Sequence, residues 1–138
     1  MIRTHLGIRA VVIAVHFGWA AAVYHKPNAP LLYQSYSAFT DFAPWHAFGW
    51  SALAIALLML LSRPGTMAAQ WASFLSSIFF FTVVAAIGRG VGFTTGVSTY
   101  SILAFASLAM FALDFRAWFS QRDWVKRLIA NPPQRWRK

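Results

Sequence analysis

The sequence contains no cysteine and only three acidic residues among its 138 positions. Without cysteine there is no disulfide, no thiolate metal ligand and no thiol nucleophile, which excludes thiol-based redox enzymes. The three acids, Asp41, Asp114 and Asp123, are scattered along the chain. General acid–base catalysis needs titratable groups within reach of one another. We therefore expect a protein that is not an enzyme and that carries no cofactor.

Charge is scarce and apolar residues are abundant: 11% of the residues are charged, 59% are hydrophobic and 17% are aromatic. A single short domain cannot bury so much apolar surface in one core, so the surplus must face lipid. Four apolar runs, at about 6–24, 45–61, 67–87 and 99–119, are each long enough to cross the hydrocarbon core as a helix. The predicted fold is an all-α membrane protein, with four transmembrane helices forming one bundle over residues 1–119.

The connections between these runs differ in composition. Residues 62–66 contain Pro64 and Gly65 and predict a tight turn between two helices. The connection at 25–44 is long and holds three prolines, which we interpret as helix breakers. Residues 88–98 contain four glycines and predict a flexible turn rather than a phosphate-binding loop, because no strand precedes them. Residues 120–138 form a basic amphipathic tail, expected to lie as a helix on the membrane surface.

The net charge is +9, and its distribution predicts an orientation in the membrane. With the N-terminus in the cytoplasm, ten Lys and Arg lie on that side, against Lys26 and Arg89 on the other. This asymmetry favours an inner-membrane protein of a bacterium with both termini cytoplasmic. It also accounts for the excess of basic residues without a nucleic-acid partner. The residues expected to contact anionic headgroups are Arg116, Arg122, Lys126, Arg127, Arg135, Arg137 and Lys138.

The N-terminal run allows a second interpretation. Arg3 and Arg9 precede an apolar stretch that ends in three alanines, Ala20–Ala22, and this pattern is also typical of a cleavable signal peptide. Cleavage there would leave three spans with the new N-terminus outside. The following apolar runs and His16 inside the first one favour a retained span.

Small residues recur at helical spacing on two of the spans. Because small side chains let neighbouring backbones approach closely in lipid, both sets are candidates for helix packing. They are Ala10, Ala14, Gly18 and Ala22 on the first span and Ala69, Ser73 and Ser77 on the third.

Polar residues inside the spans are few, and each has two interpretations. His5, Arg9 and His16 share one face of the first helix and could line a pore; alternatively His5 and Arg9 reach the headgroups and only His16 is deep. Gln70 shares a face with Ser73 and Ser77, which favours interhelical hydrogen bonds over a conduction path. On the fourth span, Tyr100, Ser107 and Asp114 follow one another at spacing seven. A deep histidine is costly in lipid, so His16 is expected to have a partner.

Asp114 is the one acid close to a span, and Arg9 should lie at a similar depth on the cytoplasmic side. An unpaired charge at that depth is unfavourable, so we predict an ion pair between Asp114 and Arg9.

Histidines also raise the question of a metal or a haem. His25 and His46 close the outer ends of the first two spans, and Asp41 lies between them in sequence, so the three could form a surface metal site. Their spacing is not a known ligand motif. His16 and His46 could ligate a haem only if they lay at the same depth in the membrane, but their expected depths differ by roughly 12 Å. Neither a metal nor a haem is therefore predicted.

The layout resembles small four-span membrane proteins of tailed phages, some of which are described as holins. The resemblance is carried by Tyr33-Gln-Ser-Tyr36, by Pro44-Trp45 and Gly49-Trp50, by the basic turn at Arg63 and by the glycines before Tyr100. It implies a small multi-span protein with a charged cytoplasmic tail and no assigned functional residue.

These observations predict a non-enzymatic integral membrane protein that self-associates and permeabilises the membrane in the manner of a holin. In that hypothesis the small residues of the first span pack helices, and His16 with the Gln70 face lines the lesion. The alternative is an accessory subunit within a larger membrane complex. A small transporter or channel is a third class, which would need a deep charged group.

Overall fold

The computed structural model describes residues 2–122, 126–127 and 130, with side chains from Leu6 onward, and all regular structure within them is helical. The order of elements is α1 (Ile2–His25), α2 (Ala29–Leu32), α3 (Gln34–Ser37), η1 (Ala38–Asp41), α4 (Trp45–Leu61), α5 (Met67–Val91) and α6 (Thr95–Ser120). The predicted all-α class is confirmed for this part of the chain.

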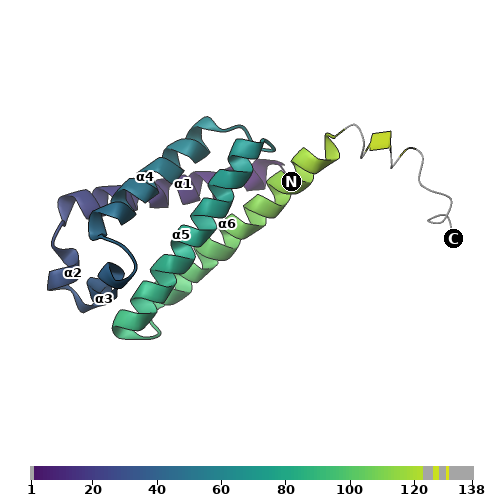
Figure 1. Ribbon diagram of the computed structural model, residues 1–138. Helices are drawn as coiled ribbons and strands as arrows, with labels where there is room; N and C mark the ends of the chain where they lie inside the picture. The colour runs from purple at the N-terminus through teal and green to yellow at the C-terminus, as the bar shows by residue number, and fades with distance from the viewer. Residues whose placement is uncertain (1, 123–125, 128–129, 131–138) are drawn as a thin grey trace.

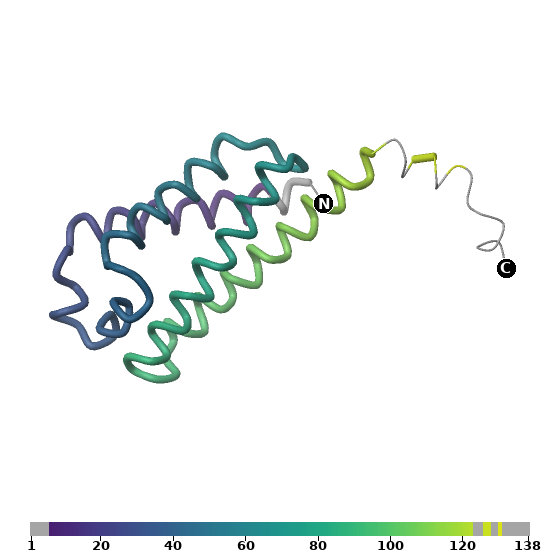
Figure 2. The backbone as a smooth tube through the Cα atoms, viewed as in Figure 1, coloured from purple at the N-terminus to yellow at the C-terminus, as the bar shows by residue number. Residues whose placement is uncertain are grey.

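The long helices form two antiparallel pairs, α1 with α4 and α5 with α6, and α4 also contacts α5 (Figure 1). One end of the bundle holds the start of α1 and the turn between α4 and α5; we call it the turn end. The opposite end holds α2, α3 and η1 and the short link between α5 and α6; we call it the loop end (Figure 2). The buried residues of α1 that face the other helices include Val12, Trp19 and Val23.

In the part of the chain that the structure describes, three helical segments are long and apolar enough to cross a membrane: Leu6–His25, Met67–Val91 and Thr95–Ser120. The 17 residues of α4 coincide with the predicted run at 45–61. At 1.5 Å per residue they reach about 25 Å, slightly less than the hydrocarbon core of about 30 Å. The segment Gln34–Asp41 and α4 together form an apolar pair that is bent by 85°. By length and composition the described residues thus contain three candidate spans, or four if this bent pair forms one span.

The prediction of a flexible glycine-rich turn at 88–98 is wrong in its extent. Helix α5 continues through Gly88 and Gly90, and α6 already begins at Thr95. Helix α5 ends at Val91, and the next residue, Gly92, has a φ of +77°, a conformation that favours glycine. Position 90 requires a glycine for a different reason, because a Cβ there would lie 2.8 Å from the backbone oxygen of Gln34. The link between α5 and α6 is therefore a short connection of three residues, 92–94.

The long connection at 25–44 is also more ordered than the prolines suggested. Pro30 occupies the first turn of α2, where a proline needs no hydrogen bond from its nitrogen. The connection then continues as α3 and η1 and packs against α5. Its buried Phe39 and the indole of Trp45, which donates to the carbonyl of Lys26 over 3.0 Å, fix it to the loop end.

The close approach of α1 and α4 depends on Gly49. A Cβ at this position would lie 2.9 Å from Cγ1 of Val23, and the β-branched valine has little rotamer freedom to move away. We expect Gly49→Ala to lower the free energy of unfolding by about 1–3 kcal/mol through overpacking, measured by circular dichroism in detergent micelles. Gly18→Ala is the matched control, because no atom lies within 4 Å of a Cβ there. Equal stability of the two variants would contradict the close approach.

Candidate functional site

Helices α1, α5 and α6 place polar side chains in the interior of the bundle, and we call this set the polar core. Arg9 and His16 on α1 are seven residues apart, as are Ser107 and Asp114 on α6, so each pair shares one helix face. All members are buried, and α5 supplies the largest share. The polar core consists of Arg9, His16, Gln70, Ser73, Ser76, Ser77, Ser107 and Asp114.

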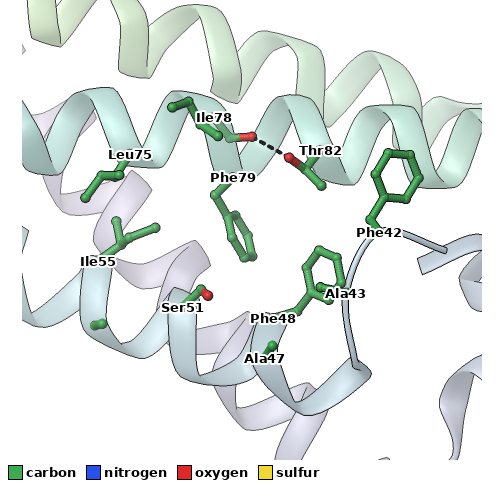
Figure 3. A pocket seen from close by; sticks show the side chains of 11 residues that line it. Phe42, Ala43, Ala47, Phe48, Ser51, Ile55, Leu75, Ile78, Phe79 and Thr82 are labelled. Carbon is green, nitrogen blue, oxygen red and sulfur yellow. Dashed lines mark hydrogen bonds between the residues drawn. The ribbon is translucent and has the colours of Figure 1, made fainter. Parts of the chain in front are cut away.

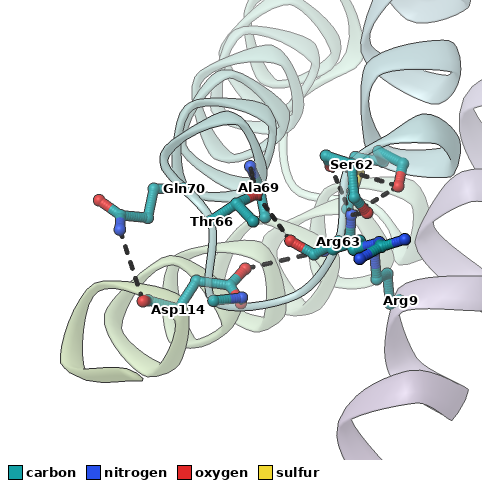
Figure 4. A network of polar contacts seen from close by, with 9 residues as sticks. Arg9, Ser62, Arg63, Thr66, Ala69, Gln70 and Asp114 are labelled. Atoms are coloured by element: carbon teal, nitrogen blue, oxygen red, sulfur yellow. Dashed lines mark hydrogen bonds and ion pairs between the residues drawn. The ribbon is translucent and has the colours of Figure 1, made fainter. Parts of the chain in front are cut away.

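The predicted ion pair between Arg9 and Asp114 is confirmed at the turn end (Figure 4). Nη1 of Arg9 lies 3.7 Å from Oδ2 of Asp114, and the two side chains are only 6% and 2% exposed. Nη2 of Arg9 also donates to the carbonyl and the hydroxyl of Ser62, over 2.9 and 2.7 Å, and to the carbonyl of Met59. The guanidinium therefore caps the last carbonyls of α4 while it neutralises a carboxylate from α6.

Asp114 in turn holds the tight turn in place. Its Oδ1 accepts a hydrogen bond from the backbone N–H of Gly65 over 2.7 Å, and Gly65 has a φ of +78°. Nε2 of Gln70 donates to the Asp114 carbonyl over 3.5 Å. One arginine and one aspartate thus connect α1, α4, the α4–α5 turn and α6, which are distant in sequence.

Halfway along the bundle, His16 is fully buried and has the partner that a deep histidine requires. Its Nε2 lies 2.9 Å from Oγ of Ser76, which lies 2.9 Å from Oγ of Ser107. The imidazole also stacks on Phe80, with ring centroids 4.6 Å apart, and meets Phe79 edge-on at 4.9 Å. Sequence reasoning found His16 and Ser107 but missed Ser76, which links them.

At the loop end the core becomes aromatic and is centred on Trp19. Five rings lie 5.6–6.3 Å from its ring, contributed by Tyr36, Phe39, Trp45, Phe79 and Tyr100. Beside it is a cavity of about 410 Å³ between α1, α6 and the connection. Lys26 and His25 lie among its lining residues, together with Trp19 and Tyr100. This cavity brings polar groups to the loop end of the polar core.

A second cavity, of about 580 Å³, lies between α4 and α5 (Figure 3). No ionisable residue is among its lining, and the hydroxyl of Thr82 donates to the carbonyl of Ile78 within its own helix. The remaining lining is mainly alanine, phenylalanine, leucine and isoleucine. This cavity suits hydrocarbon and offers no group for acid–base chemistry.

The three metal candidates do not come together. His25 and His46 line one cavity on the outer side of α1 and α4, but Asp41 lies 3.7 Å from the guanidinium of Arg89 instead. Within the described residues no group of three His, Cys, Asp or Glu side chains could hold a metal. His16 is buried beside Ser76 whereas His46 is exposed, so these two histidines do not face each other either.

The two sets of small residues lie in opposite environments. Ala69, Ser73 and Ser77 are buried inside the bundle. Ala10, Ala14, Gly18 and Ala22 are all exposed, and no atom lies within 4 Å of a Cβ built on Gly18. The second set therefore does not pack helices within one chain, and we call it the small-residue face of α1.

The basic residues that follow the last span are exposed where the structure describes them. Arg116, Arg122, Lys126 and Arg127 are exposed, and the Arg122 guanidinium lies 4.3 Å over the ring of Trp118. Arg135, Arg137 and Lys138, and most of the predicted surface helix, lie outside the described residues.

Comparison of the chain with protein-family models, with curated proteins and with solved structures finds no match.

Proposed function

We propose that the chain is a non-enzymatic, four-span protein of the bacterial inner membrane that self-associates through the small-residue face of α1 and permeabilises the membrane in the manner of a holin. The observation that carries this proposal is the exposure of Ala10, Ala14, Gly18 and Ala22. In lipid, helices associate where small residues let their backbones approach. The polar inward face of α1 is already used within the chain, so this face is available to a second copy.

Four spans are supported by the pairing of α4 with α1. Gly49, near the start of α4, lies against Val23, and Ser62, just after its end, binds Arg9. The two contact positions on α1 are 14 residues apart, which corresponds to about 21 Å along a helix. A segment that accompanies α1 over this length occupies the same membrane slab. The exposed arginines Arg116 and Arg122 then meet anionic headgroups on the cytoplasmic side, with both termini there.

An accessory subunit of a larger membrane complex is the second candidate. One observation favours it: His16, Gln70 and Ser73 are buried within a single chain, so they do not provide a polar outer face for a lesion between copies. The small-residue face would then receive a helix of a different protein.

Replacing Gly18 by leucine tests the proposal, because the added side chain meets no atom of its own chain within 4 Å at Cβ. We expect the wild type, expressed at controlled levels in a bacterium, to form crosslinked oligomers, to depolarise the membrane and to admit an impermeant dye. Gly18→Leu should lose all three effects because it separates the packed backbones. Ala109→Leu, which enlarges an exposed small residue of α6, should behave as the wild type.

Unchanged crosslinking in Gly18→Leu would overturn self-association through this face. An intact membrane potential at high, inserted levels of the wild type would overturn the permeabilising role. Copurification with other chains in fixed stoichiometry would then support the accessory subunit.

A further inference from the structure

Buried polar groups extend through the bundle interior from the turn end to its middle, and the half-buried Tyr100 continues the series toward the loop end. On α5, Gln70, Ser73 and Ser76 are three residues apart, so successive side chains are separated by a rise of about 4.5 Å. On α6, Asp114, Ser107 and Tyr100 continue the same direction at spacing seven, and on α1 Arg9 and His16 do so as well. The hydrogen-bonded trio of His16, Ser76 and Ser107 is the centre of this series.

Four members of the series have a buried polar atom without a hydrogen-bond partner among the described residues, and two of these atoms, Nη1 of Arg9 and Oδ2 of Asp114, face each other in the ion pair. Nδ1 of His16 and Oγ of Ser73 are buried and have no hydrogen-bond partner among the described residues. An unsatisfied polar group in hydrocarbon is energetically costly, because no water is present there to form the missing hydrogen bond. Internal water removes this cost, and it binds where a site offers several polar partners.

We propose that the polar core, with His16 at its centre, is a proton path through a single chain. A neutral imidazole has one protonated and one unprotonated nitrogen. A proton that binds the unprotonated nitrogen converts the ring to an imidazolium. Loss of the proton from the other nitrogen then restores the neutral ring. In this path Nε2 of His16 exchanges protons with the hydroxyl of Ser76, which is hydrogen-bonded to that of Ser107, and Nδ1 exchanges them with an internal water molecule.

Both ends of the path reach groups near the surface. At the loop end, Trp19 lies one helical turn from His16 and, with Tyr100, lines the cavity that also contains Lys26. At the turn end, the amide of Gln70 donates to the backbone carbonyl of Asp114. The carboxylate of Asp114 accepts from the N–H of Gly65 in a turn with exposed neighbours.

The packing of the path favours protons over larger ions. The rings of Phe79 and Phe80 lie against the imidazole of His16, which leaves hydrogen-bonded groups and single waters as the carriers. The charges of Arg9 and Asp114 oppose each other at 3.7 Å, so this buried pair adds no net charge to the interior of the path. The path does not depend on self-association, because all of its groups belong to one chain.

The test is proton flux into vesicles that contain the purified full chain at high dilution in lipid, together with a trapped pH-sensitive dye and a trapped larger fluorophore. A potassium gradient with valinomycin provides the driving force. We expect the wild type to acidify vesicles faster than protein-free lipid while the larger fluorophore stays inside. His16→Phe and the double variant Ser76→Ala/Ser107→Ala should fall to the rate of protein-free vesicles.

Thr82→Val is the matched control, because its hydroxyl lies on the same helix as Ser76 but bonds its own backbone, and it should conduct as the wild type does. Circular dichroism and gel filtration establish that each variant is folded; if His16→Phe is not, the serine double variant decides. Absence of flux through the wild type, or equal flux through folded core variants, overturns the proposal. Flux accompanied by loss of the larger fluorophore also overturns it and instead supports the lesion described under Proposed function.

Discussion

Asp114→Ala should lower the free energy of unfolding of the bundle by about 3–5 kcal/mol. The substitution leaves the guanidinium of Arg9 buried without its counter-charge, and it removes the acceptor for the N–H of Gly65. An uncompensated buried charge costs far more than the pair itself contributes. Unfolding in detergent micelles, followed by circular dichroism, measures the loss.

A second aspartate provides the matched control for Asp114. Asp41 and Arg89 lie the same 3.7 Å apart as the buried pair, but their side chains are 51% and 65% exposed. Solvent screening reduces such a pair to about 1 kcal/mol or less, so Asp41→Ala should change stability little. The double variant Arg9→Met/Asp114→Leu should recover much of the loss, because an apolar pair leaves no charge unmatched. A loss for Asp114→Ala no larger than that for Asp41→Ala would show that burial does not strengthen the pair.

The ion pair could be predicted because the sequence offers so few alternatives. One acid lies close to a span, one arginine lies at its depth, and an unpaired charge is excluded there. The partner of His16 could not be chosen in the same way. Ser73, Ser76 and Ser77 all lie within about one turn of α5, and only the rotation of α5 against α1 selects Ser76. That rotation results from packing over the whole helix length and leaves no local signal.

Prolines and glycines were harder to interpret, because each has two structural uses. The sequence suggests Pro30 as a helix breaker, yet Pro30 lies in the first turn of α2, where the helix requires no N–H from it. Gly88 and Gly90 suggested a flexible turn but are helical, and the backbone of α3 occupies the space of a Gly90 side chain. Such a contact involves residues more than fifty positions apart, so a single sequence does not reveal it.

The small residues of α1 and α5 show what the spacing of residues along a helix does not reveal about the candidate site. Both sets consist of small residues at a spacing of four, and this pattern predicts a packing surface for each. Yet Ala69, Ser73 and Ser77 are buried within the chain, whereas the small-residue face of α1 is exposed. Helix spacing identifies a face that favours close approach, but which neighbour approaches it depends on the order in which the helices surround one another.

Trp19→Ala should destabilise the bundle by about 3–5 kcal/mol, because it removes the ring on which the loop end is packed. Trp19 is 6% exposed and contacts rings from α3, η1, α4, α5 and α6. Deleting it opens a cavity among side chains that belong to five separate elements, so the surroundings cannot collapse as one unit. Unfolding followed by circular dichroism is the appropriate measurement, since it does not depend on the deleted fluorophore.

Trp50→Ala separates packing within the chain from the general effect of losing an indole in lipid. Trp50 lies on α4 but is 69% exposed, so its removal should change stability by about 0.5 kcal/mol or less. In a bilayer, lipid chains are as apolar as the side chains, so a tryptophan stabilises the bundle through its contacts with other helices rather than through transfer from water. Similar losses for the two variants would contradict this account and would mean that the aromatic cluster around Trp19 does not hold the loop end together.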